Sequence, residues 1–429
     1  MQGDSILIAT LIVIGLIFIA SLSAIFMRRA HFPYTIGLLI IGILVGFLAT
    51  RVETLAVMRQ VQLTPDIILF LILPTLLFEA SINIDSRMLL RNLVPILLFA
   101  TLGLLVSTTV VGLGISALTP LTLGAALLFG ALISATDPVA VIALFKELGV
   151  PKRLSTLVDG ESLFNDATAI VVFNILIGII SAGAAFSSSV VIDGIGQFLL
   201  VFFGGLAVGA VLGVLMLRII AMEKSNHMVQ AALTSVLAYL SFIIAEHFLE
   251  VSGVMAVVAA GIACSWVSAR VFDERMRHYL TEFWEFLAFL ANSMIFLLMG
   301  LTEYHLFADL GRYHDNITYI LAGFVLTLVA RLLVVYGLTP LSNRLAPATR
   351  VGRAEQAVIF WGGLRGAVPL ALALGLPADF EHRVIIIDLT LGVVLMSLLL
   401  QGTSISWLLR RLGIGGENEP GEASTPPRP

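Results

Sequence analysis

Long apolar runs follow one another along almost the whole chain, and they constrain its fold more than any other feature. Crossing the hydrocarbon core of a bilayer takes about 20 apolar helical residues. The runs between clusters of charged residues are thirteen: 5–27, 34–49, 63–80, 93–118, 121–145, 153–182, 195–221, 227–248, 252–270, 280–303, 316–338, 354–377 and 384–409. None alternates with period two, which excludes barrel strands. We therefore expect an all-α polytopic membrane protein with thirteen transmembrane helices.

The composition agrees with this class of protein and excludes several others. Hydrophobic residues make up 59% of the chain and charged residues only 12%, whereas soluble domains carry about 25% charged residues. A net charge of −4 provides no basic surface for nucleic acid. The single cysteine, Cys264, excludes a disulfide scaffold. We expect one transmembrane domain, 1–413, and a short disordered tail, 414–429.

The basic residues predict the orientation. With the N-terminus outside, 18 of the 24 Lys and Arg residues fall in the inner connections and the tail, and four fall in the outer connections. Under the positive-inside rule this bias predicts a cell-membrane protein whose C-terminus lies in the cytoplasm. The first run has no basic residues before it and exceeds the apolar stretch of a signal peptide, so we expect it to remain as a helix.

Six ionisable residues lie well inside the runs, where each costs at least about 2.5–3.5 kcal/mol to insert and therefore suggests a function. They are four acids and two bases: Glu79, Asp137, Glu161, Asp166, Arg331 and Arg365. The excess of acids suits a site for a cation or a proton. Buried ion pairs remain an alternative for Glu161, Arg331 and Arg365. Glu79 either attracts cations at the mouth of a pathway or is an ordinary interfacial carboxylate.

The sixth run contains the sequence VDGESLFNDATAIVVF. On a helix, Ser162 and Asp166 share one face, and Glu161 and Asn165 form the adjacent pair. Asp166 lies near the middle of the run, so we expect it at the centre of the membrane. The sequence therefore predicts a proton site at Asp166 that a small cation can contest.

The fifth run contains Pro138, which removes a backbone donor and clashes with the preceding turn. We expect the helix to break at 135–137, next to Asp137, where freed carbonyl groups such as that of Thr136 can coordinate a cation. The alternative is an ordinary proline kink, although a kink does not require an aspartate beside the proline.

The twelfth run is rich in glycine, with Gly362, Gly363 and Gly366 before Pro369. Small residues alone would indicate close helix packing. Aligning Pro138 with Pro369, however, superposes small and apolar residues around both positions, and the two runs cross the membrane in opposite directions. Interrupted helices at corresponding places in two halves are typical of transporter binding sites.

The sequence thus predicts two inverted six-helix repeats, about 5–182 and 227–409, joined by a linker helix at 195–221. A helix break exposes a partial negative end on one half-helix and a partial positive end on the other. If the two breaks meet, Arg365 can neutralise the carbonyl ends and Asp137 the amide ends.

Other classes of function find little support. The chain has no HExxH, GxSxG or P-loop motif, so we expect neither an enzyme nor a cofactor. An intramembrane aspartyl protease would pair Asp137 with Asp166, but it needs no inverted broken helices. An ion channel would conduct without moving protons.

Four motifs in order resemble those of bacterial NhaP-type sodium/proton exchangers, which belong to the first cation:proton antiporter family together with the animal exchangers. These motifs are LPTLLFEA, ATDP, GESLFNDATA and GGLRGAVPLALAL. The resemblance covers nearly the whole chain. It implies thirteen helices, with broken fifth and twelfth helices crossing at mid-membrane, and a homodimer with a dimerising panel and a moving panel.

The resemblance also implies roles for residues. Asp166 matches the aspartate that binds Na⁺ and H⁺, assisted by Ser162, Asp137 and the backbone of Thr136. Asn165 stands where electrogenic relatives have a second aspartate. With Asn165 neutral, Asp166 alone carries one Na⁺ or one proton, which predicts an electroneutral 1:1 exchange.

The remaining charged residues have counterparts too. Glu161 and Arg331 match the buried ion pair of the family, and Arg365 matches the arginine of the twelfth helix. Glu79 resembles an acidic residue that helps to hold the cation in archaeal members. The expected substrates are Na⁺, or K⁺ or Li⁺, and H⁺, and a K⁺/H⁺ antiporter remains the alternative.

Overall fold

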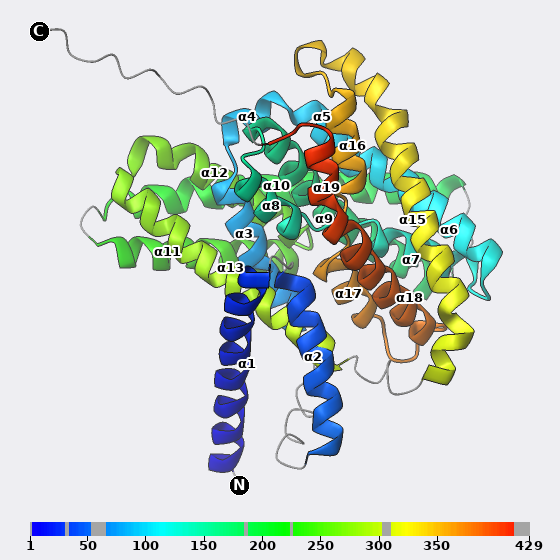
Figure 1. Ribbon diagram of the computed structural model, residues 1–429. Coiled ribbons are helices and arrows are strands. Elements are labelled where there is room, and N and C mark those ends of the chain that lie inside the picture. The colour runs from blue at the N-terminus through cyan, green and yellow to red at the C-terminus, as the bar shows by residue number, and fades with distance from the viewer. Residues whose placement is uncertain are drawn as a thin grey trace, which may run out of the picture.

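The computed structural model describes residues 2–30, 34–52, 66–183, 188–223, 226–302 and 310–415, and within these ranges every regular element is a helix (Figure 1). Nine of the described helices are long and apolar enough to cross a membrane. Three shorter apolar segments accompany them, at Ile67–Asn83, Leu123–Ile133 and Gly253–Val267. An all-helical membrane architecture follows. Most of the predicted tail, 414–429, lies outside the described residues.

The helices begin and end close to the limits of the apolar runs. In the first half of the chain they are α1 (Gln2–Ala30), α2 (Tyr34–Arg51), the π-helical η2 (Ile67–Ile72) with α3 (Leu73–Asn83), α4 (Ser86–Arg91), α5 (Leu93–Leu97), η3 (Leu98–Gly103) with α6 (Leu104–Leu118), α7 (Leu123–Ile133), α8 (Val139–Leu148) and α9 (Lys152–Ser181). In the second half they are α10 (Ser188–Ile220), α11 (His227–Ile243) with η4 (Ile244–Phe248), α12 (Gly253–Val271), α13 (Glu274–Thr302), α15 (Leu310–Leu345), η5 (Pro347–Thr349), α16 (Arg353–Trp361), α17 (Ala367–Leu374), and α18 (Arg383–Met396) with η6 (Ser397–Gly402) and α19 (Thr403–Arg411).

Two groups of helices pack together (Figure 1). In one group α13 packs on α1, α2 and α3, and α12 packs on α3, α10 and α11. In the other group α6, α7, α15, α17 and α18 pack around one another. The helix α9 contacts members of both groups, including α7 and α10. Its central place brings the predicted site residues on α9 next to the interrupted helices.

Glycine allows the backbones of α2 and α13 to touch. A Cβ added to Gly42 would lie 2.3 Å from the carbonyl oxygen of Leu297, and one added to Gly300 would lie 2.2 Å from that of Leu39. Small residues at such contacts are the usual means of close helix packing in membranes, where lipid offers apolar side chains no hydrophobic gain. This packing holds in place α13, whose polar residue Thr281 lies beside α3.

Two helices are interrupted, in the fifth and twelfth apolar runs, as the sequence predicts. The chain leaves the helix at 134–138, between α7 and α8, and again at 362–366, between α16 and α17. Pro138 directly precedes α8, whereas Pro369 is the third residue of α17, in the first turn, where a missing N–H is tolerated. Aligning the two prolines therefore places the breaks three residues out of register. The glycines, and not Pro369, end α16.

Candidate cation and proton site

The carboxylate of Asp166 lies on α9, beside the break between α7 and α8. One turn earlier on the same helix, the Ser162 hydroxyl donates to the carbonyl oxygen of Thr136 in the break. Ser162 and Thr136 are both buried. Asp166 Oδ1 and the neighbouring Asn165 Oδ1 are buried and have no hydrogen-bond partner among the residues that the structure describes. Asp166 shares a helix face with Ser162 and interacts electrostatically with Asp137, so its carboxylate lies near the same break. Carboxylate, hydroxyl and carbonyl oxygens are the ligands of hard cations.

Asp137 connects the two interrupted helices. Its backbone N–H donates to the carbonyl oxygen of Leu364 at 2.8 Å. Its carboxylate accepts from the N–H of Val139, at 3.0 Å, and from the N–H of Ala367. These are the first residues of α8 and α17, so one negative charge faces the positive ends of two half-helices.

Gly366 makes this position of Asp137 possible. A Cβ on Gly366 would lie 1.9 Å from Asp137 Oδ2 and 2.3 Å from Asp137 Cβ. No side chain fits in that space without moving Asp137. The glycine therefore allows the two breaks to approach each other this closely.

Arg365 provides the opposite charge at the other half-helix end. Its Nη1 donates to the carbonyl oxygens of Ser134, at 2.8 Å, and Ala135, at 3.2 Å, just after α7 ends. The residue is only 2% exposed, and its backbone N–H donates to Ser397 Oγ. The guanidinium thus faces the negative end of α7, and it also interacts electrostatically with Asp166.

Glu161 and Arg331 form a bidentate ion pair below the protein surface. Arg331 Nη1 and Nη2 donate to the two carboxylate oxygens of Glu161, each at 2.6 Å. Arg331 also donates to the carbonyl oxygen of Ile359 from Nη2, at 2.9 Å, and from Nε. The side chains are 3% and 6% exposed. This pair ties α9 to α15 and α16.

Glu79 belongs to a separate group of charges. Its Oε1 accepts from Asn83 Nδ2 at 2.8 Å within α3. Its charged neighbours are Lys146 and Glu285, and it also faces Asp159. Glu79 therefore belongs to a different acidic group from the four residues Asp166, Asp137, Ser162 and Thr136, which lie around the break between α7 and α8.

Asp159 is a charged residue that the sequence reasoning overlooked. It lies on α9, seven residues before Asp166, so both project from one face of that helix. It interacts electrostatically with Glu79 and Lys146. The signal was present in the sequence, because Asp159 falls inside the run 153–182 and at helical spacing from Asp166.

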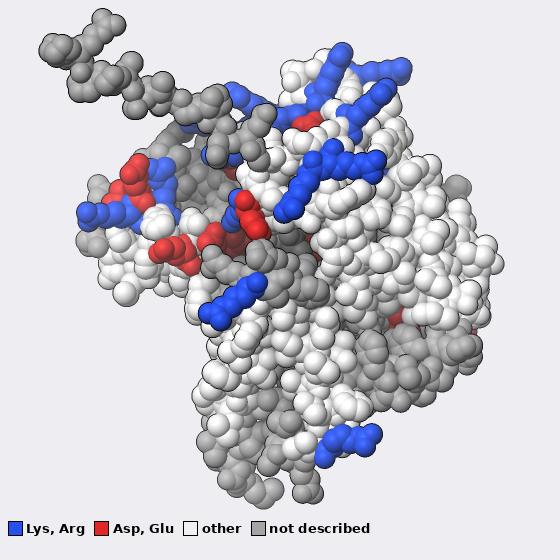
Figure 2. Space-filling view, in the orientation of Figure 1, with Lys and Arg blue, Asp and Glu red and all other residues white. Residues whose placement is uncertain are grey.

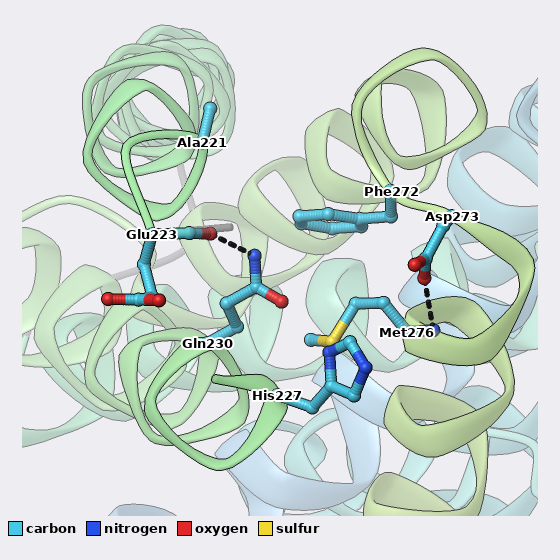
Figure 3. A pocket seen from close by; sticks show the side chains of 7 residues that line it. All are labelled: Ala221, Glu223, His227, Gln230, Phe272, Asp273 and Met276. Atoms are coloured by element: carbon cyan, nitrogen blue, oxygen red, sulfur yellow. Dashed lines mark hydrogen bonds between the residues drawn. The ribbon is translucent and has the colours of Figure 1, made fainter. Parts of the chain in front are cut away.

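A cavity of about 540 Å³ lies elsewhere, between the ends of α10, α11, α12 and α13 (Figure 3). Its lining residues are Ala221, Glu223, His227, Gln230, Phe272, Asp273 and Met276. Gln230 Nε2 donates to the backbone carbonyl oxygen of Glu223 on one side, and Asp273 caps α13 on the other. None of the residues around the two breaks lines it, so it is distinct from the candidate site.

The chain matches one protein family over most of its length. Residues 15–411 match the family described as sodium/hydrogen exchanger, transmembrane. The chain is 39% identical over 403 residues to the low-affinity Na⁺/H⁺ antiporter NhaS1 of Synechocystis sp., covering 93% of this chain and 73% of the relative. It is 36% identical over 420 residues to the Na⁺/H⁺ antiporter NhaP of Pseudomonas aeruginosa, covering 92% and 95%.

A solved structure shares the fold. The sodium proton antiporter MjNhaP1 from Methanocaldococcus jannaschii superposes with a TM-score of 0.75 at 23% sequence identity. The match covers 94% of this chain and 99% of the other. At this identity the likeness concerns the fold alone.

Proposed function

The chain belongs to the sodium/hydrogen exchanger family, and we propose that it is a secondary antiporter that exchanges one Na⁺ for one H⁺ by alternating access. Membership makes it a multi-pass membrane transporter and not an enzyme. The observation that carries the exchange is a buried Asp166 carboxylate that interacts with Asp137 at the helix break where the Ser162 hydroxyl contacts the Thr136 carbonyl.

Na⁺ binds, in this proposal, to oxygen atoms of Asp166, Ser162 and Thr136. The Ser162 hydroxyl and the Thr136 carbonyl already contact each other, and each keeps lone pairs for a cation. Asp137 adds a second negative charge close to the site while its carboxylate covers the starts of α8 and α17. A hard monovalent cation suits this set of ligands, because all of them are oxygens.

Proton transport uses the same carboxylate. Asp166 lies inside the helical domain close to two other carboxylates, Asp137 and Glu161, so its negative charge is costly once Na⁺ leaves and the carboxylate takes up a proton. Asn165, beside it, does not titrate, and Glu161 is occupied by Arg331. One carboxylate that carries either Na⁺ or H⁺ makes each cycle electroneutral.

The architecture that we propose has thirteen transmembrane helices, counting α7–α8 and α16–α17 as one interrupted helix each. Inverted repeats of about 5–182 and 227–409 flank a linker helix at 195–221, and the interrupted helices cross at mid-membrane. The bonds from Asp137 and Arg365 to the opposite break support this arrangement. The domain spans 1–413 and functions in a homodimer.

We propose further that the N-terminus lies outside the cell and the C-terminus in the cytoplasm. The bias of 18 basic residues among 24 supports this orientation. In Figure 2 most of the visible Lys and Arg side chains lie in the upper part of the molecule, and a broad uncharged surface lies below them on the right. Glu79 and Asp159 then lie on the cytoplasmic approach to Asp166, where acidic groups attract cations.

Proton flux in proteoliposomes tests this function. Adding Na⁺ outside vesicles that contain the purified protein should move protons in the opposite direction, and parallel additions of K⁺ and Li⁺ measure selectivity. The variant Asp166→Asn should abolish the flux, whereas Asp193→Asn, which changes an exposed aspartate on α10, should not. A response to K⁺ alone would identify a K⁺/H⁺ antiporter, and substantial flux in Asp166→Asn would refute the assigned site.

A further inference from the structure

Lys146 lies among carboxylates from three other helices. Its Nζ is 3.3 Å from Glu285 Oε1 on α13, and it interacts electrostatically with Glu79 on α3 and Asp159 on α9. We call these four residues the Lys146 cluster. With one base and three acids it carries a net charge of −2 when all are ionised.

The acidic part of the cluster is positioned by neighbouring polar groups. Asn83 Nδ2 donates to Glu79 Oε1 at 2.8 Å, and Thr281 Oγ1 on α13 donates to Asn83 Oδ1 at 3.3 Å. This chain of hydrogen bonds fixes Glu79 relative to α13, the helix that also carries Glu285. Glu79 is therefore held in place, whereas among the described residues Lys146 makes one exposed contact, with Glu285.

Lys146 itself is free to leave that contact. Its side chain is 71% exposed and that of Glu285 is 47% exposed. Ion pairs this exposed contribute about 0–1 kcal/mol, so they open and close readily. A lysine ammonium is a compact, hydrated point charge on a flexible stem, which resembles a small hydrated cation more than a guanidinium does.

The cluster lies on the approach to the candidate site. Asp159 and Asp166 are seven residues apart on one face of α9, which corresponds to about 10 Å along the helix. The helix that carries Lys146, α8, begins immediately after the break that holds Thr136 and Asp137. A cation that reaches Asp166 by way of Glu79 and Asp159 therefore meets two carboxylates that interact with Lys146.

We propose that Lys146 is a tethered cation that competes with Na⁺ for the acidic approach to Asp166 and thereby sets the apparent Na⁺ affinity of the exchanger. This inference rests on the proposed function. When Na⁺ is scarce, the ammonium group neutralises part of the acidic cluster, and incoming Na⁺ must displace it. The lysine thus raises the apparent KM for Na⁺ without touching the ion at Asp166.

The contact between Lys146 and Glu285 has a second interpretation, as a latch that holds α8 against α13. The two interpretations predict different signs. Breaking a latch from either side has the same effect, so Lys146→Gln and Glu285→Gln would change KM in one direction. For a tethered cation the two substitutions act in opposite directions, because one removes a competitor and the other removes an attractive charge.

The test is the KM for Na⁺ of Na⁺-driven proton flux in proteoliposomes at low ionic strength. We expect Lys146→Gln to lower KM roughly two- to fivefold and Glu285→Gln to raise it by a similar factor, both with kcat unchanged. The double variant should return toward the wild-type KM, and Lys146→Arg, which keeps the charge, should stay close to it. Added choline chloride should shrink the differences.

Lys152→Gln is the matched control, because it removes an exposed lysine at the start of α9, outside the cluster. It should leave KM unchanged. Equal KM values for Lys146→Gln and the wild type, or shifts of Lys146→Gln and Glu285→Gln in one direction, would overturn the inference. A wild-type protein without Na⁺-driven flux would instead refute the proposed function.

Discussion

The backbone N–H of Asp137 donates to the carbonyl oxygen of Leu364 at 2.8 Å, so the two interrupted helices are joined at their breaks by a main-chain hydrogen bond. The side chains extend this connection in both directions. Asp137 faces the start of α17, and Arg365 faces the end of α7. Each break therefore supplies the charge that the other break needs.

Gly366→Ala should disrupt this connection. The new methyl group would lie within 2.3 Å of two Asp137 atoms, and overpacking of this kind typically costs about 1–3 kcal/mol. We expect a lower melting temperature and a large loss of exchange activity, because Asp137 must move. The control is Gly337→Ala in α15, because no described atom lies within 4 Å of the added Cβ. This variant should keep the wild-type melting temperature and exchange activity. Wild-type activity in Gly366→Ala would show that the position of Asp137 is not critical.

Removing one member of the Glu161–Arg331 pair should destabilise the protein. A buried charge that loses its partner typically costs about 3–5 kcal/mol. We expect Glu161→Ala and Arg331→Ala each to lower the melting temperature in detergent strongly, with a smaller effect on apparent Na⁺ affinity. The exchanged pair Glu161→Arg/Arg331→Glu should recover part of the loss. Single variants as stable as the wild type would mean that the ion pair contributes little.

The interrupted helices could be predicted from the sequence because proline and glycine act locally. Pro138 disfavours a continuous helix through the preceding turn, and the Gly362–Gly363 pair weakens the twelfth run. The register of the second break could not be read from Pro369, since a proline in the first turn of α17 is compatible with a helix. Proline and glycine therefore predict that a helix is interrupted, but they predict the residue at which the interruption begins less well.

Contacts between distant segments were harder to predict. The resemblance implied that Glu161 and Arg331 form a buried ion pair, but not that the carbonyl of Ile359 would share the guanidinium. The Lys146 cluster joins residues 79, 146, 159 and 285, and only three-dimensional packing brings α3, α8, α9 and α13 together. From the sequence alone, a solvated lysine near a helix end cannot be distinguished from a lysine that lies beside carboxylates of other helices.

The exchange rate should depend on pH with a maximum. At low pH protons keep Asp166 neutral and exclude Na⁺, and at high pH too few protons are available to displace Na⁺. Because the two ions compete for one carboxylate, raising the Na⁺ concentration should move the acid limb of the profile to lower pH. Rates measured across pH at several Na⁺ concentrations test this. An acid limb that does not move with Na⁺ would argue for separate sites.

Membrane voltage should not change the equilibrium of the exchange. A cycle that moves one net charge would gain about 2.3 kcal/mol per 100 mV, whereas an electroneutral cycle gains nothing. The measurement imposes K⁺/valinomycin potentials on proteoliposomes at fixed Na⁺ and proton gradients. A shift of the equilibrium point with voltage would reveal a second charge in the cycle, and Asp137 and Glu79 would be the first residues to substitute.

The alternation of Na⁺ and H⁺ at Asp166 is tested most directly by proton release on Na⁺ binding. Purified protein in weakly buffered detergent solution, titrated with NaCl at a pH on the acid limb, should release about one proton for each Na⁺ bound, because the two ions share a carboxylate. Asp166→Asn should release none, and choline chloride should have no effect on the wild type. Stoichiometric Na⁺ binding without proton release, or undiminished release in Asp166→Asn, would contradict the account.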